Sequence, residues 1–143
     1  FTNKKRISFK IENYTSSKVN NKNFYMFNIE FMNKSRLSIS INDLIFIDGE
    51  NSYSIIKSPR LLAEKNTTRN REVIRHQEVH STKFPINITG LTSEQKFIVM
   101  YGPEKFENEI IKIIIMTNRG KINIKKYYLT LQQFTNDASE YYD

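Results

Sequence analysis

The sequence has no cysteine among its 143 residues, and only four glycines and three prolines. Without thiols the chain can form no disulfide bond, no thiolate metal site, no iron–sulfur cluster and no cysteine nucleophile. It also has neither a glycine-rich phosphate loop nor a Gly-x-Ser-x-Gly elbow. We therefore expect no catalytic residues, no cofactor and no small-molecule substrate, and we predict that the protein is not an enzyme.

Long apolar runs are missing as well. No stretch approaches the roughly 18 consecutive apolar residues that a membrane-spanning helix needs, and no secretory signal is evident. The sequence begins at Phe1 rather than at a methionine. We expect a segment upstream of Phe1 that tethers the protein to a membrane, and the compartment is otherwise left open.

The residues that are present favour strands. Ile, Phe, Tyr and Val dominate the apolar set, which makes up 38% of the chain, and β-branched and aromatic side chains suit pleated sheets. A charged fraction of 26% is ordinary for a folded globular protein. The length predicts a single domain over residues 1–131, followed by an acidic C-terminal tail over residues 132–143.

Alternating hydrophobicity predicts about eight or nine short strands. Ile7, Phe9 and Ile11 alternate with polar residues, which is typical of a strand with one buried face, here from Arg6 to Thr15. We interpret residues 16–23 as a connection and residues 66–83 as the longest irregular stretch, with 72–80 as a candidate edge strand. The other strands are expected at 25–32, 37–41, 44–47, 53–56, 84–88, 97–101, 110–117 and 121–131.

Turn residues predict how these strands are joined. Residues 48–51 suggest a tight hairpin turn, and Asn118-Arg119-Gly120 suggests a three-residue hairpin loop with Gly120 at a positive φ. That loop pairs Met116 with Ile122 but also sets Lys112 against Lys126, so we expect a bulge near Lys125-Lys126 that turns Tyr127, Leu129 and Leu131 inward. Pro85 should occupy an edge or an unpaired position. A Ser-Pro start at residue 58 predicts one short helix near residues 59–65.

These features predict an all-β fold, a two-sheet antiparallel β-sandwich. From Arg6 to Leu131 the strand pattern resembles immunoglobulin-like domains that lack their usual cysteine pair and tryptophan. It is also similar to the outer parts of small membrane-tethered proteins of unknown function. The resemblance implies a sandwich fold and carries no residue-level motif, so it assigns no role to any side chain.

One segment concentrates positive charge. The formal net charge is +7 and the isoelectric point about 9.5. Between residues 57 and 75 only Glu64 and Glu72 offset the cations, so this segment could form a basic rim that holds phosphate groups, or could be a solvated loop. The candidate binding residues are Lys57, Arg60, Lys65, Arg69, Arg71 and Arg75.

The two histidines are four residues apart. In an extended strand His76, Glu78 and His80 would share one face, which is compatible with a metal site. The order differs from the His-Glu-x-x-His pattern, and surface histidines are common, so we assign no metal and keep these three residues as weak candidates.

Three function hypotheses follow. The leading one is a non-enzymatic interaction or structural module that displays loops and a strand edge to an unidentified protein partner. The second is an electrostatic binder of nucleic acid or an anionic membrane surface through residues 57–75. The third is a metal-dependent activity at His76 and His80.

Overall fold

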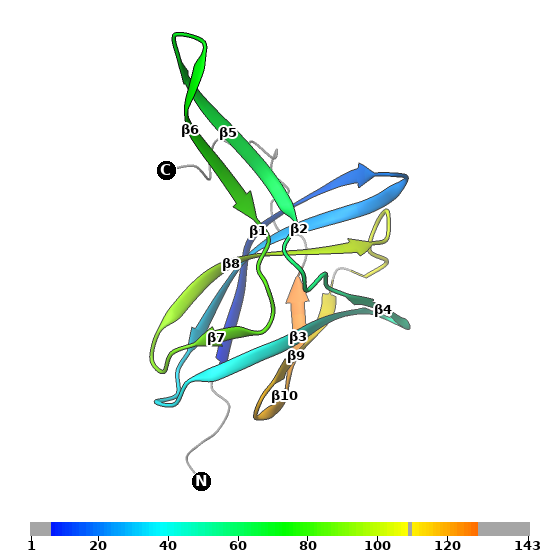
Figure 1. The fold of residues 1–143 in the computed structure, drawn as a ribbon. Helices are drawn as coiled ribbons and strands as arrows, with labels where there is room; N and C mark the ends of the chain where they lie inside the picture. The colour runs from blue at the N-terminus through cyan, green and yellow to red at the C-terminus, as the bar shows by residue number, and fades with distance from the viewer. Residues whose placement is uncertain (1–6, 109, 129–143) are drawn as a thin grey trace.

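The computed structural model describes residues 7–108 and 110–128, and this part of the chain is all-β (Figure 1). Every strand pair within it is antiparallel. The all-β prediction is therefore confirmed. In the same residues there is no helix with the length and hydropathy required to cross a membrane. The predicted tail, residues 132–143, lies outside the described residues.

The first sheet has three strands in the order β1-β2-β8. β1 joins β2 through Asn20 and Asn21, which have φ angles of 51° and 65° and so form a tight turn of the kind that matches strand twist. The predicted connection over residues 16–23 is therefore wrong, because Ser16 and Ser17 pair with Tyr25 and Phe24. The strand bounds are Ile7–Val19 for β1, Lys22–Asn33 for β2 and Ser93–Gly102 for β8.

The second sheet has five strands, with the path β10-β9-β3-β4 and β7 paired to β3. β3 unites two segments that the sequence predicts as separate strands. An irregularity between Ile41 and Asp43 shifts its alternation, so Ile41 and Leu44 are both fully buried. The predicted hairpin at residues 48–51 is confirmed, with Gly49 at a φ of 61°. The bounds are Ile39–Asp48 for β3, Asn51–Ser54 for β4, Ile86–Ile88 for β7, Ile110–Thr117 for β9 and Gly120–Tyr128 for β10.

The β9–β10 hairpin forms where the sequence predicts it. Gly120 has the expected positive φ, 107°, and the predicted bulge lies between Ile124 and Tyr127. The predicted register is wrong by one residue, because Met116 pairs with Lys121 and Ile115 with Ile122. Gly120 itself pairs with Thr117, which shortens the loop. The expected inward direction of Tyr127, Leu129 and Leu131 lies outside the side chains that the structure describes.

The two sheets pack against each other through one hydrophobic core. Phe27 of β2 and Phe46 of β3 are fully buried, and their rings stack with centroids 4.9 Å apart. Burying a side chain of this size contributes on the order of 2–3 kcal/mol. The core also includes Ile11, Ile29, Phe31, Ile39, Ile41, Leu44, Ile88, Ile98, Met100, Ile111, Ile113 and Ile115.

The predicted helix near residues 59–65 is not seen. Residues 58–60 have no regular structure, and Leu61 begins the strand β5, Leu61–Arg69. A helix of one or two turns that packs no apolar face against the rest of the protein has marginal stability. Thr67 and Thr68, by contrast, suit a strand that has a partner. That partner is β6, Glu72–His80, so the irregular stretch predicted from residue 66 is wrong and the edge strand predicted over 72–80 is confirmed.

Candidate functional site

Strands β5 and β6 form a two-stranded sheet of their own, here named the hairpin arm and defined as residues 61–80. Figure 1 shows the arm extending away from the other two sheets. Its turn is Asn70-Arg71, with φ angles of 52° and 64°. Most of its side chains are exposed, and none of the described core residues comes from it. The arm therefore presents most of its side chains to solvent.

The base of the arm is fixed to β8. Arg60 and Ser81 exchange two hydrogen bonds of 2.8 Å, from Ser81 N to Arg60 O and from Arg60 N to Ser81 Oγ. On either side of them, Ile56 N donates to Val99 O and Thr82 N donates to Phe97 O. These bonds hold the two chains of the arm together where they leave the β8 edge.

The predicted basic residues divide into two groups. Lys57 lies before the arm and forms an ion pair of 3.2 Å with Asp43, and Arg60 lies at its base. The others lie on the arm, are exposed, and take part in no ion pair among the described residues; they are Lys65, Arg69, Arg71 and Arg75. The structure thus brings four of the six candidates onto one projecting element.

Two aliphatic side chains accompany these cations near the end of the arm. Val73 and Ile74 are 58% and 59% exposed, on the β6 strand directly after the turn. A register shift between the Thr67–Arg75 and Thr68–Val73 pairs places Ile74 in a bulge. The tip therefore combines positive charge with exposed apolar surface, a combination that the sequence analysis did not identify.

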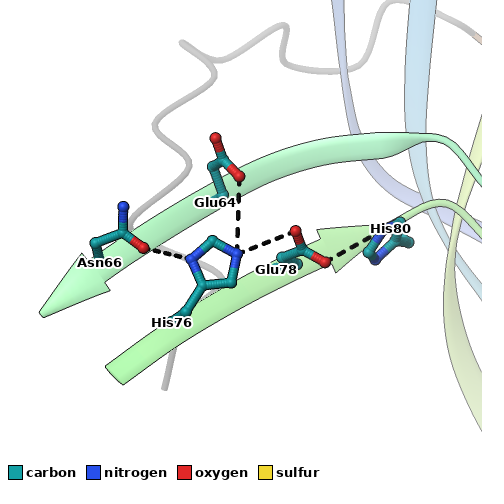
Figure 2. Close-up of polar contacts among 5 residues, drawn as sticks. All are labelled: Glu64, Asn66, His76, Glu78 and His80. Atoms are coloured by element: carbon teal, nitrogen blue, oxygen red, sulfur yellow. Dashed lines mark hydrogen bonds and ion pairs between the residues drawn. The ribbon is translucent and has the colours of Figure 1, made fainter. Parts of the chain in front are cut away.

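The three weak metal candidates share one face of β6, as the sequence predicts for a strand. His76 Nε2 lies 3.0 Å from Glu78 Oε2, and His80 Nε2 lies 3.8 Å from Glu78 Oε1 (Figure 2). The hydrogen bond with His76 lowers the pKa of the Glu78 carboxyl; desolvation raises this pKa by a smaller amount, and the neighbouring His76 and His80 rings lower it further.

The neighbouring strand adds two residues that the sequence analysis missed. Glu64 pairs with Glu78 and Asn66 pairs with His76 across the arm. Glu64 Oε2 lies 3.8 Å from His76 Nε2, and Asn66 Oδ1 contacts His76 Nδ1 (Figure 2). A register shift between the turn and these residues means that a fold about Asn70-Arg71 alone would not have placed Glu64 and Asn66 beside Glu78 and His76.

The comparisons with known proteins give no relative. No family model, no curated protein and no solved structure matches the chain.

Proposed function

We propose that this protein is a non-enzymatic binding module, an immunoglobulin-like β-sandwich whose hairpin arm binds an anionic membrane surface. The single core that joins the two antiparallel sheets supports the sandwich. The lack of enzyme motifs in the sequence supports the non-enzymatic role. The observation that carries the binding proposal is the arm itself, which holds exposed aliphatic side chains, and cations that form no ion pair with any described residue, away from the body.

The chemistry of the tip favours lipid. Juxtamembrane cations are attracted to anionic headgroups, and aliphatic side chains gain by entering the headgroup boundary. Arg69, Arg71 and Arg75 supply the charge, and Val73 and Ile74 supply the apolar surface. The arm has no Phe, Tyr or Trp, whereas binders of single-stranded nucleic acid stack bases mainly on such rings. Lipid is therefore the better match of the two anionic partners.

A protein partner is the second candidate. Both outer edges of the β5–β6 sheet are free of strand partners among the described residues. Such edges can accept an added strand through main-chain hydrogen bonds. This mode depends little on the arginines, so it predicts binding that survives high salt.

Vesicle binding tests the proposal. The full chain is mixed with vesicles of phosphatidylcholine, with and without phosphatidylserine, and the bound fraction is measured by co-sedimentation at low and high salt. Each arginine near the surface contributes about 1 kcal/mol, so replacing all three at the tip by Gln should weaken binding about 100-fold. The double variant with Val73→Ser and Ile74→Ser should also bind these vesicles more weakly. Its bound fraction at high salt should be lower than that of the wild type.

The matched control removes the same charge from the body. Lys34→Gln, Arg36→Gln and Lys105→Gln also lower the net charge by three, at exposed positions outside the arm. This variant should bind within about threefold of the wild type, because its changes lie away from the lipid contact. Three results would each contradict the proposal: an equal loss of vesicle binding in the tip and body variants, vesicle binding that is the same at low and high salt, or tighter binding to single-stranded RNA than to vesicles.

A further inference from the structure

The arm holds two carboxylates and an imidazole whose ligand atoms lie within 4.8 Å of one another, on Glu64, His76 and Glu78. Glu64 and Glu78 are direct cross-strand partners. Like charges in that position repel, so the pair destabilises the hairpin unless a cation lies between the two carboxylates. The available neighbour is the His76 ring, whose Nε2 faces both of them.

The hydrogen bond at the other ring nitrogen, Nδ1, determines whether Nε2 carries a lone pair or a proton. Asn66 Oδ1 lies next to His76 Nδ1, and the tautomer with its proton on Nδ1 donates that proton to this oxygen. In the neutral ring Nε2 then has a lone pair, and that lone pair is directed at Glu64 Oε2 and Glu78 Oε2 (Figure 2). Three electron-rich atoms that face one another repel. A cation among them, either a second proton on the ring or a metal ion, removes this repulsion.

The spacing and the atom types fit zinc. Two donor atoms bound to one tetrahedral Zn²⁺ at about 2.1 Å are about 3.4 Å apart. His76 Nε2 lies 3.0 Å from Glu78 Oε2 and 3.8 Å from Glu64 Oε2, which brackets that separation. One imidazole nitrogen with two carboxylates is a ligand set for a borderline metal such as Zn²⁺, with water in the remaining position.

We propose that the hairpin arm binds one Zn²⁺ ion through Glu64, His76 and Glu78. Asn66 is the positioning residue, because its hydrogen bond to Nδ1 holds the ring and directs Nε2 to the metal. His80 is outside the set: its Nε2 approaches Glu78 Oε1, the oxygen that does not face His76. The site takes a ligand from β5 and two from β6, so the ion joins the two strands of the arm.

A metal in this position has a structural consequence. A two-stranded sheet is at best marginally stable in water, and the side chains of β5 and β6 are exposed or half-buried, so the arm has no core of its own to stabilise it. An ion that binds only the paired strands adds its binding free energy to the folded arm. Zinc should therefore order the arm without changing the packing of the two larger sheets.

Isothermal titration calorimetry with zinc chloride tests the site on the full chain. The wild type should bind one equivalent with a dissociation constant in the micromolar range. Glu64→Gln preserves size and shape and should weaken binding at least tenfold, as should His76→Ala. Asn66→Ala keeps all three ligands and should weaken binding by about tenfold, the usual cost of losing the partner of a ligating histidine. Zinc should also slow amide hydrogen exchange in β5 and β6 of the wild type.

Two matched controls lie on the same hairpin. Glu72→Gln makes the same chemical change as Glu64→Gln at an exposed residue near the turn, and His80→Ala removes the other histidine. Both should bind zinc within about threefold of the wild type. Weak titration without saturation, equal affinity in wild type and Glu64→Gln, or a loss in His80→Ala as large as that in His76→Ala would each overturn the three-residue site.

Discussion

Asp48 is a buried carboxylate at the end of β3 that holds the loop following β8. It is 1% exposed, and it accepts hydrogen bonds from Glu107 N at 2.6 Å, Asn108 N at 3.1 Å and Asn108 Nδ2 at 2.6 Å. A carboxylate can be buried when donors replace its water shell in this way. A single side chain thus joins the β3–β4 turn to a loop that lies about 60 residues further along the chain.

We expect Asp48→Ala to lower the free energy of unfolding by about 2–3 kcal/mol, because three donors lose a charged acceptor. Asp48→Asn keeps one oxygen acceptor and should cost less. Asp43→Asn is the control: it disrupts a partly exposed ion pair with Lys57, while its amide oxygen can still accept from Leu44 N, so it should cost less than about 1 kcal/mol. Urea unfolding measures all three variants, and a cost for Asp48→Ala no larger than that for Asp43→Asn would refute the assignment.

Tyr25 makes the free energy of unfolding depend on pH in the alkaline range. Its hydroxyl donates to Pro103 O at 2.6 Å, and burial, with smaller effects of Tyr14 and Tyr53, raises its pKa from 10.0 to about 12. In the unfolded chain the phenol loses its proton near pH 10, whereas in the folded protein it retains the proton until about pH 12. The protonated Tyr25 phenol therefore contributes its full stabilisation of the fold below pH 10, and this contribution falls as the pH rises toward 12.

We expect the free energy of unfolding, measured in urea from about pH 9 to about pH 12, to decline less steeply in Tyr25→Phe than in the wild type. Some decline should remain, because burial also raises the pKa values of Tyr14 and Tyr53. An absorbance titration of the tyrosines should lose its last step in the variant. Identical slopes in the two proteins would show that Tyr25 does not ionise as proposed.

At the scale of elements, the hairpin arm depends on an unusual turn. Arg71 has a φ of 64°, a left-handed conformation that costs a non-glycine residue about 1 kcal/mol. Arg71→Gly removes that cost, although glycine loses more backbone entropy on folding, so a net gain of roughly 0.5 kcal/mol is expected. Amide hydrogen exchange in β5 and β6 should slow by roughly twofold.

Arg71→Ala is the control for this prediction. It removes the same side chain and charge but keeps the Cβ that disfavours a positive φ. Exchange in the arm should therefore be unchanged or faster in Arg71→Ala. Equal exchange rates in the glycine and alanine variants would mean that the backbone at residue 71 does not limit the stability of the turn.

The elements differ in how far the sequence predicts them. Alternation of apolar and polar residues is a local signal, so the first part of β1, the two parts of β3 and the β9–β10 hairpin with its bulge were predicted, although the register of that hairpin was wrong by one residue. The turns at Asn20-Asn21 and Asn70-Arg71 contain no glycine, and their strands carry long polar stretches, so two hairpin turns were missed. Both depend on cross-strand pairing, which overrides local preference.

The same distinction applies to the candidate site. His76, Glu78 and His80 lie on one strand, and the period of two places them on one face without knowledge of the partner strand. Glu64 and Asn66 join them only through the register of β5 against β6. That register includes two shifts, so even a correctly predicted turn would have left the pairing open. For the basic residues the sequence left a single rim and a solvated loop as alternatives; the structure places Lys57 in the body and Arg60 at the base of the arm.

At the scale of the whole molecule, the protein consists of a body with its own core and an arm that adds nothing to that core among the described residues. Leu61 and His80 are paired, and Arg60 and Ser81 are hydrogen-bonded, so the two ends of the arm are adjacent. A short Gly-Ser linker can therefore replace residues 62–79 without stretching the body. Removing an element that has no core contacts should change the free energy of unfolding of the body only slightly.

We expect this deletion variant to unfold cooperatively in urea, within about 1 kcal/mol of the wild type. Because the body keeps its fold while all arm cations and the zinc ligands are gone, binding to anionic vesicles and to zinc should fall to background together. Loss of cooperative unfolding would mean that the arm is part of the body's structure. Vesicle binding retained by a folded deletion variant would place the membrane contact on the body, since Lys34, Arg36 and Lys105 all remain there.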